Sequence, residues 1–264
     1  MILKFGELIN ENKMWYKTIP EILSWLESKS DLTWIWIDTE TTGLNGPKIE
    51  QLTQVSAIAT DYNFNQNQFT NIASFDEKIK LTPDIKKRYS TPGDDSRRIL
   101  SFNHYGSGNY KYKDEKEIVD GFFNWIEQYS PCLLIAQNAG FDMTMLGGRF
   151  GHKIKNEVLD TKRLIQLYYL PLIQTLAETD EKYKALVSKI GTSERDGGLV
   201  SSSMSKIGPA LGLNMSGYHD ALTDCKIAMQ MYQAIVDFLN QHQSVDIMKY
   251  QSERIKVIRQ EWSI

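Results

Sequence analysis

The feature that most constrains this chain is an apolar run that ends in two acidic residues. Residues 34–44 read WIWIDTETTGL, and the tryptophan and isoleucine residues predict a buried strand over 34–37. Residues two apart on a strand share one face, so Asp38 and Glu40 point the same way. Two like charges held together at an apolar strand end are costly unless a positive charge lies between them, and a divalent cation is the usual one.

Two further segments decide whether this pair is functional, because an isolated Asp-x-Glu also fits a solvated strand edge. Residues 133–142 read LLIAQNAGFD, a second apolar run that enters a turn and places Asp142 where a helix would start. Residues 218–224 read YHDALTD, so His219 and Asp224 lead into an amphipathic helix. An aspartate at a helix start is commonly a cap, and a lone histidine is commonly structural. The three segments in this order indicate a site.

Together these residues resemble the motifs of the DEDD exonuclease superfamily, histidine branch, also called DnaQ-like: Asp-x-Glu, then Asp, then His-x-x-x-x-Asp. The resemblance covers roughly residues 33–239. It implies an α/β fold of the ribonuclease H-like type, in which helices flank a mixed central sheet made of an antiparallel meander and then parallel strands. It also implies His219 as the general base and Asp220 as a neighbour that binds no metal. The implied ligands of two Mg²⁺ ions, for which Mn²⁺ substitutes, are Asp38, Glu40, Asp142 and Asp224.

The reaction implied by the resemblance is 3′→5′ exonucleolytic hydrolysis of single-stranded DNA, with release of mononucleotides. Two metal ions about 3.5–4 Å apart lower the pKa of a water molecule and stabilise both the attacking and the leaving oxygen. Relatives use backbone groups after the first motif, here Thr41 and Thr42, to meet the terminal 3′-hydroxyl. An apolar side chain, here Leu44, wedges the last base, and Asn138 is expected at the same terminus.

Two positions depart from the pattern of these relatives. Gln137 stands where they often carry His, at a position that does not coordinate metal. Gln54 stands where they often carry Glu in the second strand. The second departure is more typical of single-strand-specific DNA exonucleases than of proofreading subunits.

Other functions remain open at this point. An exoribonuclease would carry the same motifs, because the residue that meets a 2′-hydroxyl cannot be read from the sequence. The chain could also be a proofreading subunit or another partner of a DNA polymerase. A non-catalytic nucleic-acid-binding module predicts loss of at least one motif acid, and none is lost. The expected partner is a single-stranded nucleic acid with a free 3′ end, DNA in preference to RNA, with a replication partner as a further candidate.

Charge, cysteine content and hydropathy limit the binding partners and the cellular location that we expect for this chain. A formal net charge of −3 argues against a long non-specific grip on duplex DNA, which depends on Lys and Arg. Cys132 and Cys225 fall in a predicted strand and a predicted helix, which argues against a disulfide framework. No apolar run approaches the roughly 20 residues that span a bilayer, and the first residues lack the apolar core of a signal peptide. We therefore expect a cytoplasmic protein without membrane contacts.

We expect one exonuclease domain over residues 1–264, with its core at about 33–239. The first of two insertions, at about 78–114, contains basic and aromatic residues. It is either a solvated connection or a region that holds phosphates and stacks bases. The second is either a tolerated surface insertion or a lid or partner loop. The remaining parts are an N-terminal helical extension at 1–30, the insertions at about 78–114 and 171–203, and a C-terminal tail at 240–264.

Periodicity and turn residues predict the other elements. Asp160 is expected as a helix cap. The further predicted strands are 52–60, 68–75, 133–136 and a short one at 158–161. The predicted helices are 18–26, 117–128, 141–149, 164–167, 176–190, 204–213 and 224–239.

Overall fold

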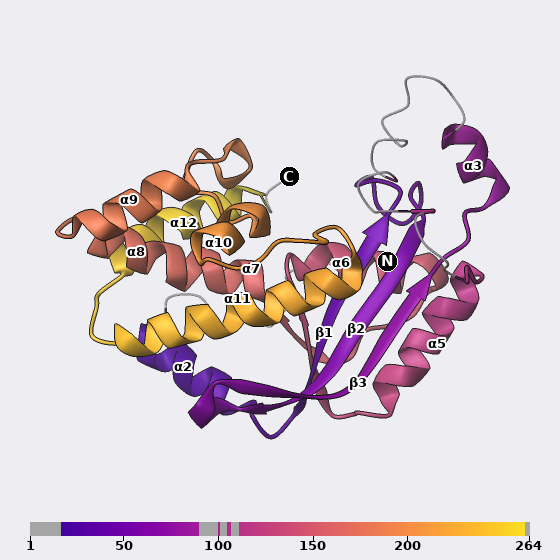
Figure 1. The fold of residues 1–264 in the computed structure, drawn as a ribbon, viewed down its shortest axis with the longest axis horizontal. Coiled ribbons are helices and arrows are strands. Elements are labelled where there is room, and N and C mark those ends of the chain that lie inside the picture. The colour runs from indigo at the N-terminus through magenta and orange to yellow at the C-terminus, as the bar shows by residue number, and fades with distance from the viewer. Residues whose placement is uncertain (1–16, 90–99, 101–104, 107–110, 262–264) are drawn as a thin grey trace.

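A mixed sheet of five strands lies at the centre of the computed structural model, which describes residues 17–89, 100, 105–106 and 111–261 (Figure 1). Its strands are β1 Thr33–Thr41, β2 Leu52–Asn63, β3 Gln68–Lys78, β4 Cys132–Ala136 and β5 Glu157–Asp160. Their order is β3-β2-β1-β4-β5. The first three strands pair antiparallel, whereas β4 and β5 run parallel to β1. The expected ribonuclease H-like α/β arrangement, a meander followed by parallel strands, is confirmed.

Helices cover both faces of this sheet. The longer ones are α2 Ile19–Glu27, α5 Glu115–Glu127, α6 Ala139–Phe150, α9 Glu181–Ile190, α11 Ala221–Gln241 and α12 Met248–Glu261. The shorter ones are α3 Pro83–Tyr89, α7 Thr161–Leu164, α8 Leu170–Leu176 and α10 Met204–Ala210, with single turns at η2 Phe64–Gln66 and η4 Glu194–Asp196 and a π-helical stretch at η3 Ile165–Tyr169. In Figure 1, α8, α9, α10 and α12 gather at the left of the view, above α11.

Alternate residues of β1 pack into two separate hydrophobic clusters. Ile35 and Ile37 belong to the cluster beneath α5 and α6. Trp34 and Trp36 belong to the other cluster, where α11 packs against β1 and β2. Because side chains alternate along a strand, the even-numbered residues of β1 face α11. The strand therefore delivers its two acids to the α11 side of the sheet.

Side chains cap the first turns of several helices. Thr18 and Glu21 form a capping box at the start of α2, and this reciprocal bonding satisfies two backbone donors. Asp160 caps α7, as expected, and Asp220 caps α11. The caps of α7 and α11 fix the first turns of two helices that adjoin the site.

The predicted helix over 176–190 is wrong in its first part. Helix α8 ends at Leu176, a turn follows, and α9 begins at Glu181. The break occurs because the Asp180 side chain accepts a hydrogen bond from the Lys182 backbone N–H at 2.8 Å and so starts a new helix. The C-terminal stretch that we expected to be a tail contains α12, whose Ile255 and Ile258 are buried in the core.

Two compositional expectations can be compared with the structure. Cys132 and Cys225 are both free and buried, so neither forms a disulfide. Within the residues that the structure describes, no helix combines the length and the apolar character needed to cross a membrane.

Candidate active site

The two acids of β1 emerge at the end of the strand on the α11 side. Glu40 is 8% exposed and Asp38 is partly buried. A register shift between Glu40 and Thr41 ends the regular pairing with β2 just beyond them. The predicted shared orientation of the pair follows from this strand geometry.

The start of α11 brings the third motif to the same place. His219 has a φ of 72°, a backbone conformation that is uncommon for a residue other than glycine. Its backbone N–H lies 3.3 Å from each carboxylate oxygen of Asp224. Ligand atoms of Glu40, His219 and Asp224 lie within 4.8 Å of one another. The His219 imidazole is thus close enough to the Glu40 and Asp224 carboxylates to act beside them as a general base or as a metal ligand.

Asp142 reaches the site from the other side of the sheet. It lies in the first turn of α6, and its Oδ1 accepts hydrogen bonds from the Thr39 backbone N–H at 3.0 Å and from Thr39 Oγ1 at 2.7 Å. Thr39 separates Asp38 from Glu40, so this contact ties α6 to the centre of the first motif. Among the described residues, Asp38 and Asp142 do not join the close group formed by Glu40, His219 and Asp224.

The electrostatics of these four acids, called here the acidic cluster (Asp38, Glu40, Asp142 and Asp224), favour a bound cation. Burial raises the pKa of Glu40 to about 9, with Asp224 and Asp142 adding to the effect and Lys78 opposing it. Burial raises the pKa of Asp142 and that of Asp224 to about 7, although hydrogen bonds from Thr39 and His219 lower them. Burial and the charges of Asp142 and Glu40 raise the pKa of Asp38 well above its ordinary value. Carboxylates that repel one another in a buried site are expected where a divalent ion binds.

A buried polar network that the sequence did not reveal holds the start of α11 on the sheet. Lys78, at the end of β3, is 5% exposed, and its Nζ lies 2.5 Å from Gln54 Oε1 and 3.1 Å from Asp220 Oδ2. Gln54 Oε1 also accepts a hydrogen bond from the Ala221 backbone N–H at 3.2 Å. Gln54 therefore serves as an anchor for the helix that carries Asp224. Lys78 falls within the predicted insertion 78–114, and no periodicity signalled its burial.

Asp160 does more than cap a helix. Its Oδ1 accepts hydrogen bonds from the Lys162 and Asn138 backbone N–H groups, both at 2.9 Å. Asn138 has a φ of 68°, so Asp160 also stabilises the turn that connects β4 to α6. Asp160 further adds to the raised pKa of Asp142.

The four residues expected at the 3′ terminus differ in their surroundings. Thr42 is fully buried, its backbone N–H donates to Gln51 O at 2.9 Å, and its hydroxyl contacts Glu50. The Thr41 hydroxyl donates to Gly43 O at 2.8 Å. Leu44 is 71% exposed, as a base-wedging side chain would be. Asn138 lines the cavity beside the acidic cluster.

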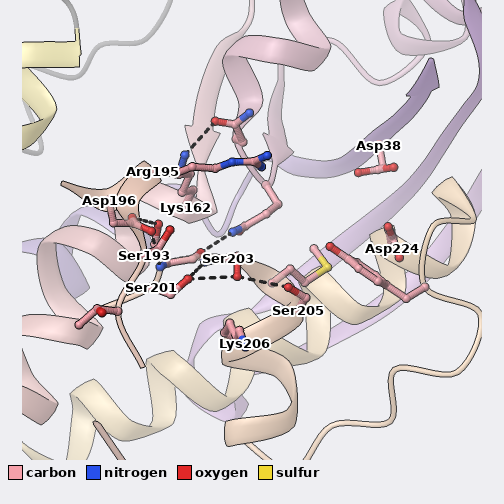
Figure 2. Close-up of a pocket in the computed structure, with 16 residues that line it drawn as sticks. Asp38, Lys162, Ser193, Arg195, Asp196, Ser201, Ser203, Ser205, Lys206 and Asp224 are labelled. Carbon is pink, nitrogen blue, oxygen red and sulfur yellow. Dashed lines mark hydrogen bonds between the residues drawn. The ribbon is translucent and has the colours of Figure 1, made fainter. Parts of the chain in front are cut away.

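That cavity has a volume of about 500 Å³ and two unlike sides (Figure 2). Asp38, Asp224 and Tyr218 line one side. Gln137 and Asn138 line the cavity at the turn between β4 and α6. The opposite side is built mainly by serines and cations that no motif predicted, and it also contains the buried Asp196. Its serines and cations are Ser193, Arg195, Ser201, Ser202, Ser203, Ser205, Lys206 and, from α7, Lys162.

The basic residues predicted in the first insertion are only partly described. Arg97, Arg98 and His104 lie outside the described residues. Arg88 approaches the fully buried Glu50 with two nitrogens at 3.2 Å, which is a structural ion pair within the fold. Lys86 lines a second cavity of about 840 Å³, together with Lys80, Lys111 and Lys113.

Comparison with known proteins gives one match to a family model. The RNase_T model, described as exonuclease, matches residues 35–232, which is well over half of the chain. All the motif residues discussed above fall within this range. A comparison with curated proteins found no match.

Solved structures with some likeness include two of exonuclease I. One is described as suggesting how processivity is achieved (16% identity, TM-score 0.49) and the other as a complex with SSB-Ct (17% identity, TM-score 0.47). Each match covers 80% of this chain, which spans only 44% of the exonuclease I chain. Cell-death related nuclease 4 matches at 13% identity and a TM-score of 0.38, over 78% of this chain and 64% of that chain. At these scores, function has to be argued from the family model and the residues.

Proposed function

This chain belongs to the RNase_T exonuclease family, and from that premise we propose that it is a metal-dependent 3′→5′ exonuclease that removes mononucleotides from single-stranded DNA. Family membership also confirms the resemblance to the DEDD exonuclease superfamily. The observation that carries the proposal is the convergence of the acidic cluster and His219 from three distant parts of the sequence.

The acidic cluster is suited to Mg²⁺ or Mn²⁺. Carboxylate oxygens are hard ligands of the kind that these ions prefer. The raised pKa values of Glu40, Asp142 and Asp224 indicate that these groups gain from a nearby positive charge. When bound, such ions supply a water molecule of lowered pKa and neutralise charge on the phosphate.

In the proposed reaction His219 accepts the proton of the attacking water. An imidazole suits this role because it titrates close to neutrality. Its backbone N–H orients Asp224, so one residue both positions a ligand and carries the base. Lys78, Gln54 and Asp220 hold this segment against β2 and β3.

Direction and substrate rest on the residues around the cavity. The exposed Leu44 supports a wedge against the last base, and Asn138 supports a contact with the 3′-terminal nucleotide. Because the Thr42 N–H already donates to Gln51 O, a backbone contact from Thr42 to the 3′-hydroxyl would use the Thr42 carbonyl oxygen as the acceptor. The net charge of −3 favours single strands held near the site over duplex DNA. A polymerase or replication partner is not required by this proposal.

The test is digestion of matched DNA and RNA oligonucleotides, single-stranded and duplex, labelled at either end, with and without Mg²⁺. We expect mononucleotides to leave from the 3′ end of single-stranded DNA and a 3′-phosphate to block the reaction, because it adds negative charge beside the acidic cluster. Closed circular single strands should resist.

Asp224→Asn is the negative control for contaminating nuclease, and Asp61→Asn, an exposed aspartate on β2, is the matched positive control. Faster digestion of RNA than of DNA would make the chain an exoribonuclease. Rapid cutting of circular DNA would make it an endonuclease.

A further inference from the structure

We propose that the segment 192–206, called here the serine wall, is a phosphate-binding wall that holds the nucleic-acid strand next to the nucleotide being removed. Arg195 and Lys206 bind backbone phosphate oxygens, and the serine hydroxyls add hydrogen bonds. This inference rests on the proposed function, since it names the substrate contacts of the same cavity.

The position of the serine wall is the first observation. It lines the cavity opposite Asp38 and Asp224, as Figure 2 shows. A strand whose terminal phosphodiester lies at the acidic cluster has to continue along a wall of this cavity. The acidic side repels a polyanion, so the opposite side must supply the attraction.

The charges on the wall are available to a ligand. Arg195 and Lys206 are exposed, and neither forms an ion pair or a side-chain hydrogen bond within the described part of the chain. Lys162 lies on the same cavity, with its Nζ 3.4 Å from Asn138 Oδ1. Guanidinium and ammonium groups are the usual partners of phosphate oxygens.

The hydroxyl groups form a connected row. Ser201 Oγ lies 3.2 Å from Ser203 Oγ, which lies 3.3 Å from Ser205 Oγ. Each hydroxyl can donate one hydrogen bond, so in a row of three the last hydroxyl keeps an unused donor. Ser203 and Ser205 are exposed, and a phosphate oxygen, which only accepts, fits that donor.

Buried contacts hold the wall in place. Asp196 is 5% exposed and accepts hydrogen bonds from the Ser202 backbone N–H at 3.1 Å and from Gln166 Nε2 at 3.1 Å. Arg254, from α12, places Nη1 3.7 Å from Asp196 Oδ1 and Nη2 2.5 Å from Val200 O. A Cβ at Gly197 would approach the Val257 side chain to 2.8 Å, so the wall lies directly on α12. Helix α12 lies beyond the residues that the family model matches.

The experiment compares strand binding with chemistry in Arg195→Ala/Lys206→Ala. Binding of a labelled single-stranded oligonucleotide is measured by fluorescence anisotropy over a range of salt concentrations. Hydrolysis is measured on a small substrate without a neighbouring strand, the p-nitrophenyl ester of thymidine 5′-monophosphate. Lys184→Ala/Lys189→Ala on α9 removes the same charge from exposed positions and is the matched control.

We expect the wall variant to bind the strand more weakly and to lower the slope of log affinity against log salt by about 1.4, because each lost phosphate contact on a single strand contributes about 0.7. Hydrolysis of the ester should stay close to that of the control. An unchanged salt slope would overturn the inference, and so would an equal loss on the ester. If the wild type binds strands through the wall but hydrolyses neither substrate, the proposed function fails while the binding of phosphates by the serine wall stands.

Discussion

Asp196 and the acidic cluster are both withdrawn from water, but they differ in what lies beside them. Asp196 has the Arg254 guanidinium and several hydrogen-bond donors around it. Each member of the acidic cluster has other carboxylates as neighbours, and the nearby Lys78 is engaged with Gln54 and Asp220. Burial alone therefore does not identify a functional acid. Burial without a compensating charge does, because such a site is costly until a cation binds.

Removing any carboxylate of the acidic cluster should have the largest effect. We expect Asp38→Asn, Glu40→Gln, Asp142→Asn and Asp224→Asn each to abolish nearly all activity, because a ligand is lost. The change is measured as nucleotide release with Mg²⁺, beside Asp61→Asn as the control. A variant with near-normal turnover would show that its acid is not a metal ligand. That acid would then have a structural role, as Asp196 has.

The role of His219 is the next test. His219→Ala should lower kcat by roughly 10²–10⁴-fold, the usual contribution of a positioned general base, and higher pH should partly restore the rate. Metal affinity, measured by calorimetric titration, should stay near the wild-type value. If metal affinity falls as far as in Asp224→Asn, His219 is a ligand, as its closeness to Glu40 and Asp224 would allow.

Removing the cation from Asp196 should make that residue resemble the acidic cluster. Arg254→Met leaves a buried carboxylate without its guanidinium, and we expect the free energy of unfolding to fall by roughly 3–5 kcal/mol. Urea denaturation measures the change. The double variant Asp196→Asn/Arg254→Met should recover part of the loss. Wild-type stability in the single variant would show that the pair does not anchor the wall.

The last test is the dependence of stability on pH, which has a definite sign. The raised pKa values of Glu40, Asp142 and Asp224 mean that the folded protein holds protons that the unfolded chain has released. Stability without metal should therefore fall as pH rises from about 4 towards 9. Thermal unfolding in EDTA measures this trend. Mg²⁺ should reverse it at high pH, and Asp224→Asn should weaken it, whereas a rise in stability with pH would contradict the assigned environment.

Local patterns predicted the parts of this molecule that depend on neighbours in sequence. The alternation along β1 predicted that Asp38 and Glu40 share one face, and the helix cap at Asp160 was also predicted. The order of the three motifs predicted the candidate site. The break before α9 was missed because residues 177–179 are compatible with a helix and only Asp180 signals the new start.

Contacts between distant segments could not be predicted in the same way. Lys78 meets Asp220 across 142 positions, and Arg254 meets Val200 across 54, so neither pair leaves a periodic signal. A buried lysine and a buried arginine look like exposed residues in the sequence, because their partners are known only once the chain has folded.

The pairing of β1 with β2 makes the hydrophobic core and the acidic site depend on the same alignment. Trp36 pairs with Ile58 and Asp38 with Ser56, in one continuous register. A one-residue slip of β1 against β2 would move both the tryptophans and the carboxylates to the other face of the sheet. Carboxylates would then enter the cluster around Val55 and Ala57, and such a chain would be unstable as well as unable to bind a cation. A mutation that shifts this register would therefore prevent folding, and it could not produce a folded protein in which only the acidic site is displaced.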